Sequence, residues 1–137
     1  MRTLAICFLS VTLLHCATVS DRPASVAAPT VTVDVPGTIF FGAGNTAPVT
    51  LEVSITNHAT TPLRVRQIEA STPTMTTYRL QNIRQRFDET IATGETKTLK
   101  LFTNAVTSVN SPKEPLSVRT VVTLEANGVP FREITMR

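Results

Sequence analysis

The eight residues VTLEVSIT at positions 49–56 are the strongest evidence for the fold class of this chain. In these eight residues apolar positions alternate with polar ones, and this period of two predicts a β-strand with one buried face. Residues 57–62 form the expected turn, and residues 63–68 are the expected partner strand of a hairpin. The alternation shifts near Gln67, so a bulge or bend is expected there.

Short β-prone segments extend through the rest of residues 30–137, separated by turn residues such as Pro, Gly and Asn. Asn127-Gly128 is a strong signal for a two-residue hairpin turn. Pro130 places the last strand at a sheet edge, because proline cannot donate to a ladder. Residues 104–115 carry two prolines and predict a loop. The other expected strands are 30–35, 38–41, 76–86, 97–102, 116–126 and 130–136.

Seven to eight strands at this spacing predict an all-β fold, an immunoglobulin- or fibronectin-like antiparallel β-sandwich. No window of the sequence shows the period of an amphipathic helix. The predicted core consists of Phe40, Phe41, Leu51, Val53, Ile55, Leu63, Val65, Leu80, Leu99, Leu101, Val122 and Leu124.

The composition is that of one globular domain, with 137 residues, 42% of them hydrophobic and 17% charged. No apolar run reaches the ~18 residues expected of a membrane-spanning helix. The formal net charge of +3 is small and is not clustered, so nucleic-acid binding is not expected. Composition therefore excludes a disordered tail, a coiled coil and a multidomain enzyme.

The N-terminal residues have the pattern of an export signal. In residues 1–16, Arg2 precedes a compact apolar stretch that has the length of a signal-peptide core. Residues 17–29 are rich in Ala, Ser and Pro and predict a flexible tether. Residues 30–137 would then form the sandwich domain. A first strand or helix of the domain itself remains the alternative for the apolar stretch.

Leu13-Leu14-His15-Cys16 resembles the lipobox of bacterial lipoproteins, in which a leucine stands three residues before the cysteine that is lipidated. His15 departs from that pattern, which has Gly, Ala or Ser at this position. The resemblance implies a lipid on Cys16 and, because Ala17 rather than Asp follows, retention at the outer membrane. Ordinary cleavage after Ser20 is the alternative, and it would release a soluble exported domain.

A second resemblance covers residues 48–137. LEVSITN at 51–57, followed by TPLRV at 61–65, looks like the strand, turn and hairpin of late-embryogenesis-abundant β-sandwiches, also called water-stress and hypersensitive-response domains. Residues 91–99 resemble the later glycine turn of that family, whose Asn-Pro-Asn turn is here Asn57-His58-Ala59. The resemblance implies an immunoglobulin-like sandwich without catalysis, linked to stress protection or binding.

The sequence offers no catalytic or metal-binding constellation. His58 is the one histidine beyond the signal segment, and it falls in a predicted turn with no second histidine to pair with it. Asp88 and Glu89 are adjacent and would point to opposite faces of a strand, so they would not share an acid–base site. We therefore expect no enzyme activity, no cofactor and no metal.

The candidate binding residues are five arginines in β-prone segments: Arg64, Arg66, Arg79, Arg84 and Arg86. Alternation places the first two on one strand face and the last two on another, so neighbouring strands would join them into a stripe on one sheet. Such a stripe favours an anionic partner, namely lipid headgroups, an acidic glycan or an acidic protein patch. The alternative is an ordinary solvated face, with Glu52 and Glu69 as cross-strand partners.

These observations predict a non-enzymatic accessory module of the cell envelope, exported and lipid-anchored at the outer membrane or in the periplasm. Its partners would be the membrane, through the anchor, and an envelope protein or an anionic glycan or lipid. Two other functions remain open. One is a stress-protective domain that stabilises membranes or proteins. The other is a pilus or secretion-system component that uses strand addition, with residues 130–136 supplying the edge.

Overall fold

The computed structural model of the chain describes residues 21–73, 78–108 and 115–137. Within these ranges the chain forms eight strands and no helix, and so has no helix that could cross a membrane. The strands are β1 (Thr30–Asp34), β2 (Thr46–Thr56), β3 (Leu63–Ser71), β4 (Tyr78–Leu80), β5 (Ile83–Ile91), β6 (Thr96–Thr107), β7 (Arg119–Ala126) and β8 (Val129–Met136).

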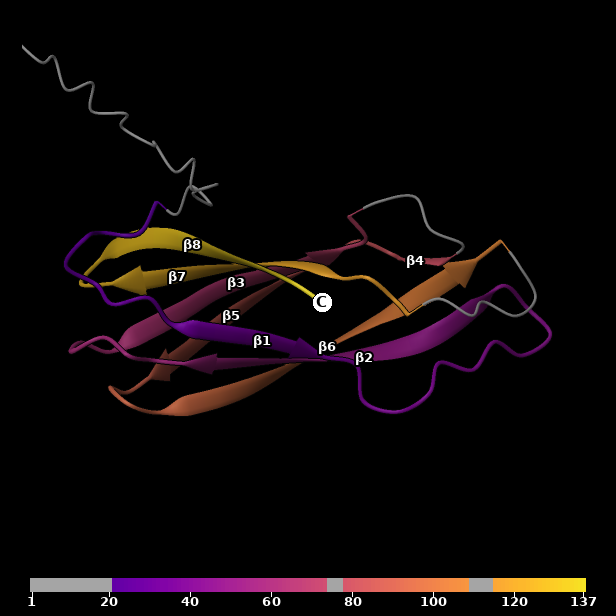
Figure 1. Cartoon of the computed structure of the whole chain (residues 1–137), viewed down its shortest axis with the longest axis horizontal. Coiled ribbons are helices and arrows are strands. Elements are labelled where there is room, and N and C mark those ends of the chain that lie inside the picture. Colours follow the sequence, from indigo (N-terminus) through magenta and orange to yellow (C-terminus); the bar gives the residue numbers. More distant parts are fainter. Residues whose placement is uncertain (1–20, 74–77, 109–114) are drawn as a thin grey trace, which may run out of the picture.

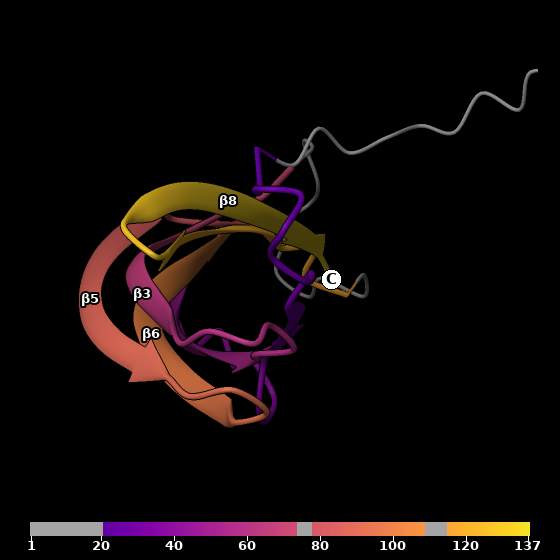
Figure 2. The ribbon, with the colours of Figure 1, turned by 90° about the vertical axis from the view of Figure 1, so that its left-hand side faces the viewer.

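The strands form two four-stranded antiparallel sheets that pack face to face (Figure 1). One sheet has the strand order β1-β2-β6-β4 and the other has the order β5-β3-β7-β8. Figure 2 looks along the long axis and shows the two sheets curving around a common core. The chain is therefore a β-sandwich, as the sequence predicts.

β2 is the strand that the alternating stretch predicted, and it lies inside its sheet. It pairs with β1 on one side and along its whole length with β6 on the other. Its inward residues are buried, and they meet buried residues of the opposite sheet, so each apolar side chain contributes roughly 1.5–3 kcal/mol of transfer free energy. The largest fully buried side chains are Leu51, Ile55, Leu63, Ile68, Ile91, Leu101, Leu124, Phe131, Val53, Val65, Val118 and Val122.

A β-bulge interrupts β3 between Val65 and Gln67, where the register shifts against both neighbouring strands. This confirms the shift expected near Gln67. In a regular strand, Val65 and Ile68 would face opposite sides, yet both are fully buried. The two residues between them, Arg66 and Gln67, both lie on the outer side. The bulge thus keeps the apolar residues inside and places two consecutive polar residues outside.

The turn at the end of β2 is held by Asn57, whose side chain is fully buried. Its amide nitrogen Nδ2 donates hydrogen bonds to the carbonyl oxygens of Thr61 at 2.9 Å and Ile91 at 3.0 Å. Its oxygen Oδ1 accepts a bond from the backbone N–H of Ala59 at 2.8 Å. Its backbone also bonds to Gly94 and Glu95, so one residue joins the β2–β3 turn to the β5–β6 turn.

The hairpin between β7 and β8 has the predicted two-residue turn. Asn127 and Gly128 have φ angles of 51° and 80°, the left-handed conformation that this kind of turn requires and that glycine adopts without strain. β8 lies at the edge of its sheet, as Pro130 predicts.

Residues 38–41 form no strand, which corrects the sequence prediction. Phe40 is 80% exposed, whereas Phe41 packs partly buried against the core. The reason is topological. β2, to which these residues lead, already pairs with β1 on one side and β6 on the other, so residues 38–41 cannot pair beside it.

Residues 76–86 were predicted as one strand, but the chain divides there between the two sheets. β4 pairs with β6, and β5 pairs with β3. At the crossing, the Gln81 N–H donates to the carbonyl of Asn104 at 2.8 Å, and the Thr103 hydroxyl donates to the carbonyl of Gln81 at 2.8 Å. β6 therefore continues to Thr107, although residues 104–115 were predicted to form a loop.

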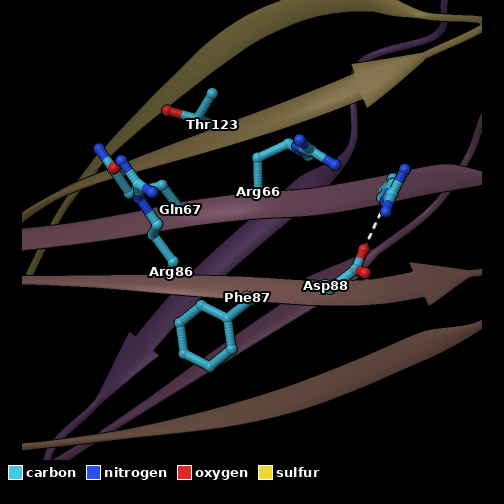
Figure 3. A pocket seen from close by; sticks show the side chains of 7 residues that line it. Arg66, Gln67, Arg86, Phe87, Asp88 and Thr123 are labelled. Atoms are coloured by element: carbon cyan, nitrogen blue, oxygen red, sulfur yellow. Dashed lines mark hydrogen bonds and ion pairs between the residues drawn. The ribbon is translucent and has the colours of Figure 1, made fainter.

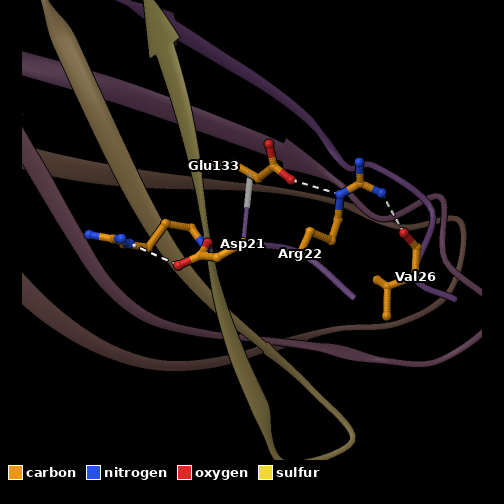
Figure 4. A network of polar contacts seen from close by, with 5 residues as sticks. Asp21, Arg22, Val26 and Glu133 are labelled. Carbon is orange, nitrogen blue, oxygen red and sulfur yellow. Dashed lines mark hydrogen bonds and ion pairs between the residues drawn. The ribbon is translucent and has the colours of Figure 1, made fainter. Parts of the chain in front are cut away.

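Residues 21–29 belong to the stretch that composition assigned to a flexible tether, yet they lie against the domain. Val26 is 5% exposed and joins the hydrophobic core. Arg22 forms an ion pair with Glu133 of β8, at 3.0 Å between Nε and Oε1 (Figure 4). Small residues have no bulk of their own to bury, but one valine and two charged residues are enough to dock this segment.

We expect Asn57→Ala to lower the free energy of unfolding by about 3 kcal/mol, because it leaves buried carbonyl and N–H groups without partners. Urea denaturation of the full chain measures this change. Asn104→Ala is the matched control: its amide bonds to the exposed side chain of Gln81, and we expect a change within about 0.5 kcal/mol. Equal effects of the two substitutions would contradict the role given to Asn57.

Candidate anion-binding site

The outer side of the sheet β5-β3-β7-β8 is rich in arginine. Its outward positions carry six arginines and three carboxylates, and we call this surface the arginine face. Because the formal net charge of the whole chain is only +3, this one face accounts for most of the excess positive charge. The charged residues are Arg64, Arg66, Arg84, Arg86, Arg119, Arg132, Glu69, Asp88 and Glu125.

The centre of the arginine face is a hollow of about 510 Å³ beside the bulge. Cross-strand pairing aligns Arg86 of β5, Gln67 of β3 and Thr123 of β7 in one row. The bulge adds Arg66 next to Gln67 (Figure 3). The lining residues are Arg64, Arg66, Gln67, Arg86, Phe87, Asp88 and Thr123.

The three arginines of the hollow differ in how far carboxylates neutralise them. Arg64 Nε lies 2.5 Å from Asp88 Oδ1, and Arg66 Nε lies 3.7 Å from Glu125 Oε2. Arg86 makes no ion pair with any residue that the structure describes. The hollow therefore keeps one unpaired guanidinium and one loosely paired guanidinium facing solvent.

Hydrogen bonding fixes the charge of Asp88. The Arg64 side chain donates to its carboxylate, and this bond together with the positive charge of Arg64 lowers the pKa of Asp88 below its ordinary value of 3.8. The same contact raises the pKa of Arg64. At neutral pH the carboxylate thus orients Arg64 and neutralises it, while Arg66 and Arg86 supply the positive charge.

A smaller hollow of about 260 Å³ lies further along the same face. Arg84 contributes to it from β5 and forms an ion pair with Glu69 of β3, at 3.3 Å between Nη2 and Oε2. Arg119 of β7 lies in the same hollow and forms no ion pair within residues 21–73, 78–108 and 115–137. Glu69, one of the two cross-strand partners named for a solvated face, thus pairs with an arginine of this face, whereas Glu52, the other, pairs with Lys100 on the other sheet.

Arg79 does not belong to the arginine face, which corrects the sequence prediction. It lies on β4, in the opposite sheet, and lines a separate hollow with Thr46 and Val106. Its position between Arg66 and Arg84 in the sequence was misleading because the chain changes sheets after Leu80. Cys16, the expected lipidation site, lies outside the described residues.

The structure does not bring the side chains of His58, Asp88 and Glu89 together in one site. His58 is exposed, and its Nε2 lies 2.8 Å from the Thr30 hydroxyl. Asp88 points outward to Arg64, whereas Glu89 contacts Lys97 at 2.5 Å. The part of the chain that the structure describes holds no group of three His, Cys, Asp or Glu side chains that could bind a metal ion.

The geometry of the central hollow suits an anion. Guanidinium groups donate planar pairs of N–H bonds that match carboxylate and phosphate oxygens. The Gln67 amide and the Thr123 hydroxyl add uncharged donors in the same row. Sequence reasoning missed Arg119, Arg132 and Thr123 on this face, although the alternation on both sides of the Asn127-Gly128 turn could have placed them there.

No family model matches the chain, and no curated protein matches it by sequence. Among solved structures, structural-genomics target SoR45 is similar with a TM-score of 0.53 and 7% identity, over 80% of this chain and 83% of that one. A Bordetella pertussis protein assigned as ApaA has a TM-score of 0.50 and 19% identity, over 82% and 94%. A protein from Archaeoglobus fulgidus has a TM-score of 0.48 and 9% identity, over 79% and 90%. At these identities the likeness to the first two shows the fold alone.

We expect Arg64→Gln to raise the pKa of Asp88 back toward 3.8, because it removes both the hydrogen bond and the positive charge. Carbon NMR titration of the carboxyl group measures this. Since the folded pKa is lowered, the contribution of Asp88 to stability is present above about pH 4 and is lost as the pH falls through the lowered value. Arg84→Gln is the control and should leave Asp88 unchanged, because Arg84 pairs with Glu69. An unchanged Asp88 titration in Arg64→Gln would refute the assignment.

Proposed function

We propose that the chain is a non-enzymatic accessory module of the cell envelope, attached by a lipid on Cys16. Its arginine face binds an anionic group of an envelope partner. The observation that carries this proposal is the central hollow, where Arg66 and Arg86 face solvent. The one carboxylate in its lining, that of Asp88, is already paired with Arg64. The lipobox-like residues at 13–16 supply the attachment.

The distribution of charge supports binding over a role in stability. Ion pairs between exposed groups typically contribute only about 0–1 kcal/mol, and Arg86 has no such pair among the described residues. Several like charges on one face repel one another unless an anion lies between them. A carboxylate or phosphate in the hollow would meet guanidinium groups from two strands and would relieve that repulsion.

The rigid sheet supports the same proposal. β3, which carries Arg64 and Arg66, is paired on both sides, so the positions of these side chains are set by backbone ladders and not by a mobile loop. Val65 and Ile68, on either side of the bulge that exposes Arg66, are buried in the core and fix the backbone there. A site that is formed in advance loses less conformational entropy on binding.

We expect the double substitution Arg66→Gln with Arg86→Gln to weaken binding of inorganic phosphate, and of a polyglutamate peptide, at least about tenfold. NMR titration of the arginine side-chain N–H signals measures the affinity. Arg79→Gln is the matched control, because it removes the same charge from the opposite sheet and should leave the affinity unchanged. Equal losses in both variants would indicate a general charge effect and would refute the site.

The lipid anchor is tested separately. We expect the full chain, expressed in a diderm bacterium, to partition into the membrane and to carry acyl mass on Cys16, and Cys16→Ser to abolish both. Intact mass and membrane fractionation measure this. A soluble protein that starts near Asp21 would instead show that His15 prevents lipoprotein processing.

A further inference from the structure

Residues 21–26 form a clamp on β8 (Figure 4). Asp21 Oδ1 accepts a hydrogen bond from the backbone N–H of Arg132 at 2.7 Å, and its Oδ2 lies 3.2 Å from Arg132 Nε. Arg22 pairs with Glu133 and also donates from Nη1 to the carbonyl of Val26 at 2.5 Å. With Val26 buried, this N-terminal clamp attaches the chain to the domain at three points.

The N-terminal clamp also covers the edge of β8. An edge strand presents unpaired N–H groups that attract other strands, and here the Asp21 carboxylate occupies one of them, that of Arg132. The backbone hydrogen bond from Arg132 is the main reason why the pKa of Asp21 is lowered, so this carboxylate stays charged at neutral pH. The edge at residues 130–136, which was predicted to be available for strand addition, is therefore partly occupied by the chain's own Asp21.

The clamp shortens the distance between a lipid on Cys16 and the domain. Five residue steps lead from Cys16 to Asp21, and an extended chain covers at most about 18 Å over that length. If residues 17–29 were all free, as composition predicted, the reach would be more than twice as long. A short connection to a fixed point on β8 limits which side of the sandwich can turn toward the membrane.

The surface around this attachment point suits a bilayer interface. Ile134 and Met136 of β8 are 46% and 58% exposed, and they lie on the outer side of the sheet. Cross-strand pairing puts Met136 opposite Arg119, while Arg132 lies on the same side of β8. Exposed apolar side chains next to arginines can enter the headgroup region. Arg119, which forms no ion pair among the described residues, can meet anionic lipids there, whereas Arg132 is already paired with Asp21.

We infer that the β8 side of the sandwich lies against the bilayer that holds the anchor, with Arg119, Arg132, Ile134 and Met136 at the level of anionic headgroups. This inference rests on the lipid attachment of the proposed function. β5 is the opposite edge of the same sheet, so the β5 end of the central hollow is its part farthest from β8 and the part that a partner can reach, while its other end, at Thr123, lies next to Arg132.

The test measures which side of the acylated full chain lies near the lipid. Met136→Cys and Phe102→Cys each place one thiol at an exposed apolar position, on β8 and on the outer side of the opposite sheet respectively. Each is labelled with the same fluorophore, in vesicles of phosphatidylethanolamine and phosphatidylglycerol that carry a quencher on their headgroups. We expect several-fold stronger quenching at position 136 than at position 102.

Two further arms decide the outcome. Asp21→Ala with Arg22→Ala releases the clamp and should reduce the difference between the two labels; an unchanged difference would overturn the role of the clamp. Vesicles of phosphatidylcholine alone should weaken quenching at position 136, because they lack the anionic headgroups that Arg119 meets.

Equal quenching of the two labels in acylated protein would overturn the inferred orientation and leave the lipid anchor intact. Absence of acyl mass on Cys16 would instead refute the anchor, and the orientation with it. Intact mass of each labelled variant separates these two results. Urea denaturation of the clamp variant checks that the core still folds, which we expect because Asp21 is half-exposed and Arg22 is partly exposed on the surface of the domain.

Discussion

The side-chain amide of Asn57 connects the two turns at one end of the sandwich, and much of the structure depends on this connection. It lies at the end of β2, an inner strand of one sheet, and donates to the last residue of β5 in the other. A buried amide that lacked partners would destabilise the fold, so these bonds fix how the sheets are positioned against each other. The same amide bonds to Thr61, just before β3, and to Ile91, the last residue of β5, so it also holds together the ends of the two strands that carry the centre of the arginine face.

The bulge in β3 links the core to the surface. An uninterrupted strand would send Arg66 and Gln67 to opposite sides, and one of them would enter the core. The extra residue allows Val65 and Ile68 both to be buried, and it brings Arg66 beside Arg86 and Gln67 on the outside. The same local irregularity therefore protects the core and builds the hollow.

Sequence reasoning was accurate where one local pattern decided the outcome. The strand at 49–56, the shift near Gln67, the Asn127-Gly128 hairpin and the edge position of the last strand all follow from alternation or from turn chemistry. It was wrong for Phe40, which is exposed, and for residues 76–86, because apolar and β-prone residues do not reveal which neighbour a strand will find. The docking of residues 21–29 was missed because it rests on contacts with β8, more than a hundred residues later.

Alternation was enough to predict the all-β class and most of the buried residues, because it assigns side chains to faces within a strand. For the same reason it placed Arg64 with Arg66, and Arg84 with Arg86, on one face of their strands. Which strands become neighbours is a property of the folded chain: the two sets of arginines lie on adjacent strands, Arg79 lies on the other sheet, and Arg119 and Arg132 join the same face. The same holds for the N-terminal clamp, which closes on β8. The physical reason is that strand pairing and side-chain docking join residues far apart in the chain, and local periodicity carries no information about such contacts.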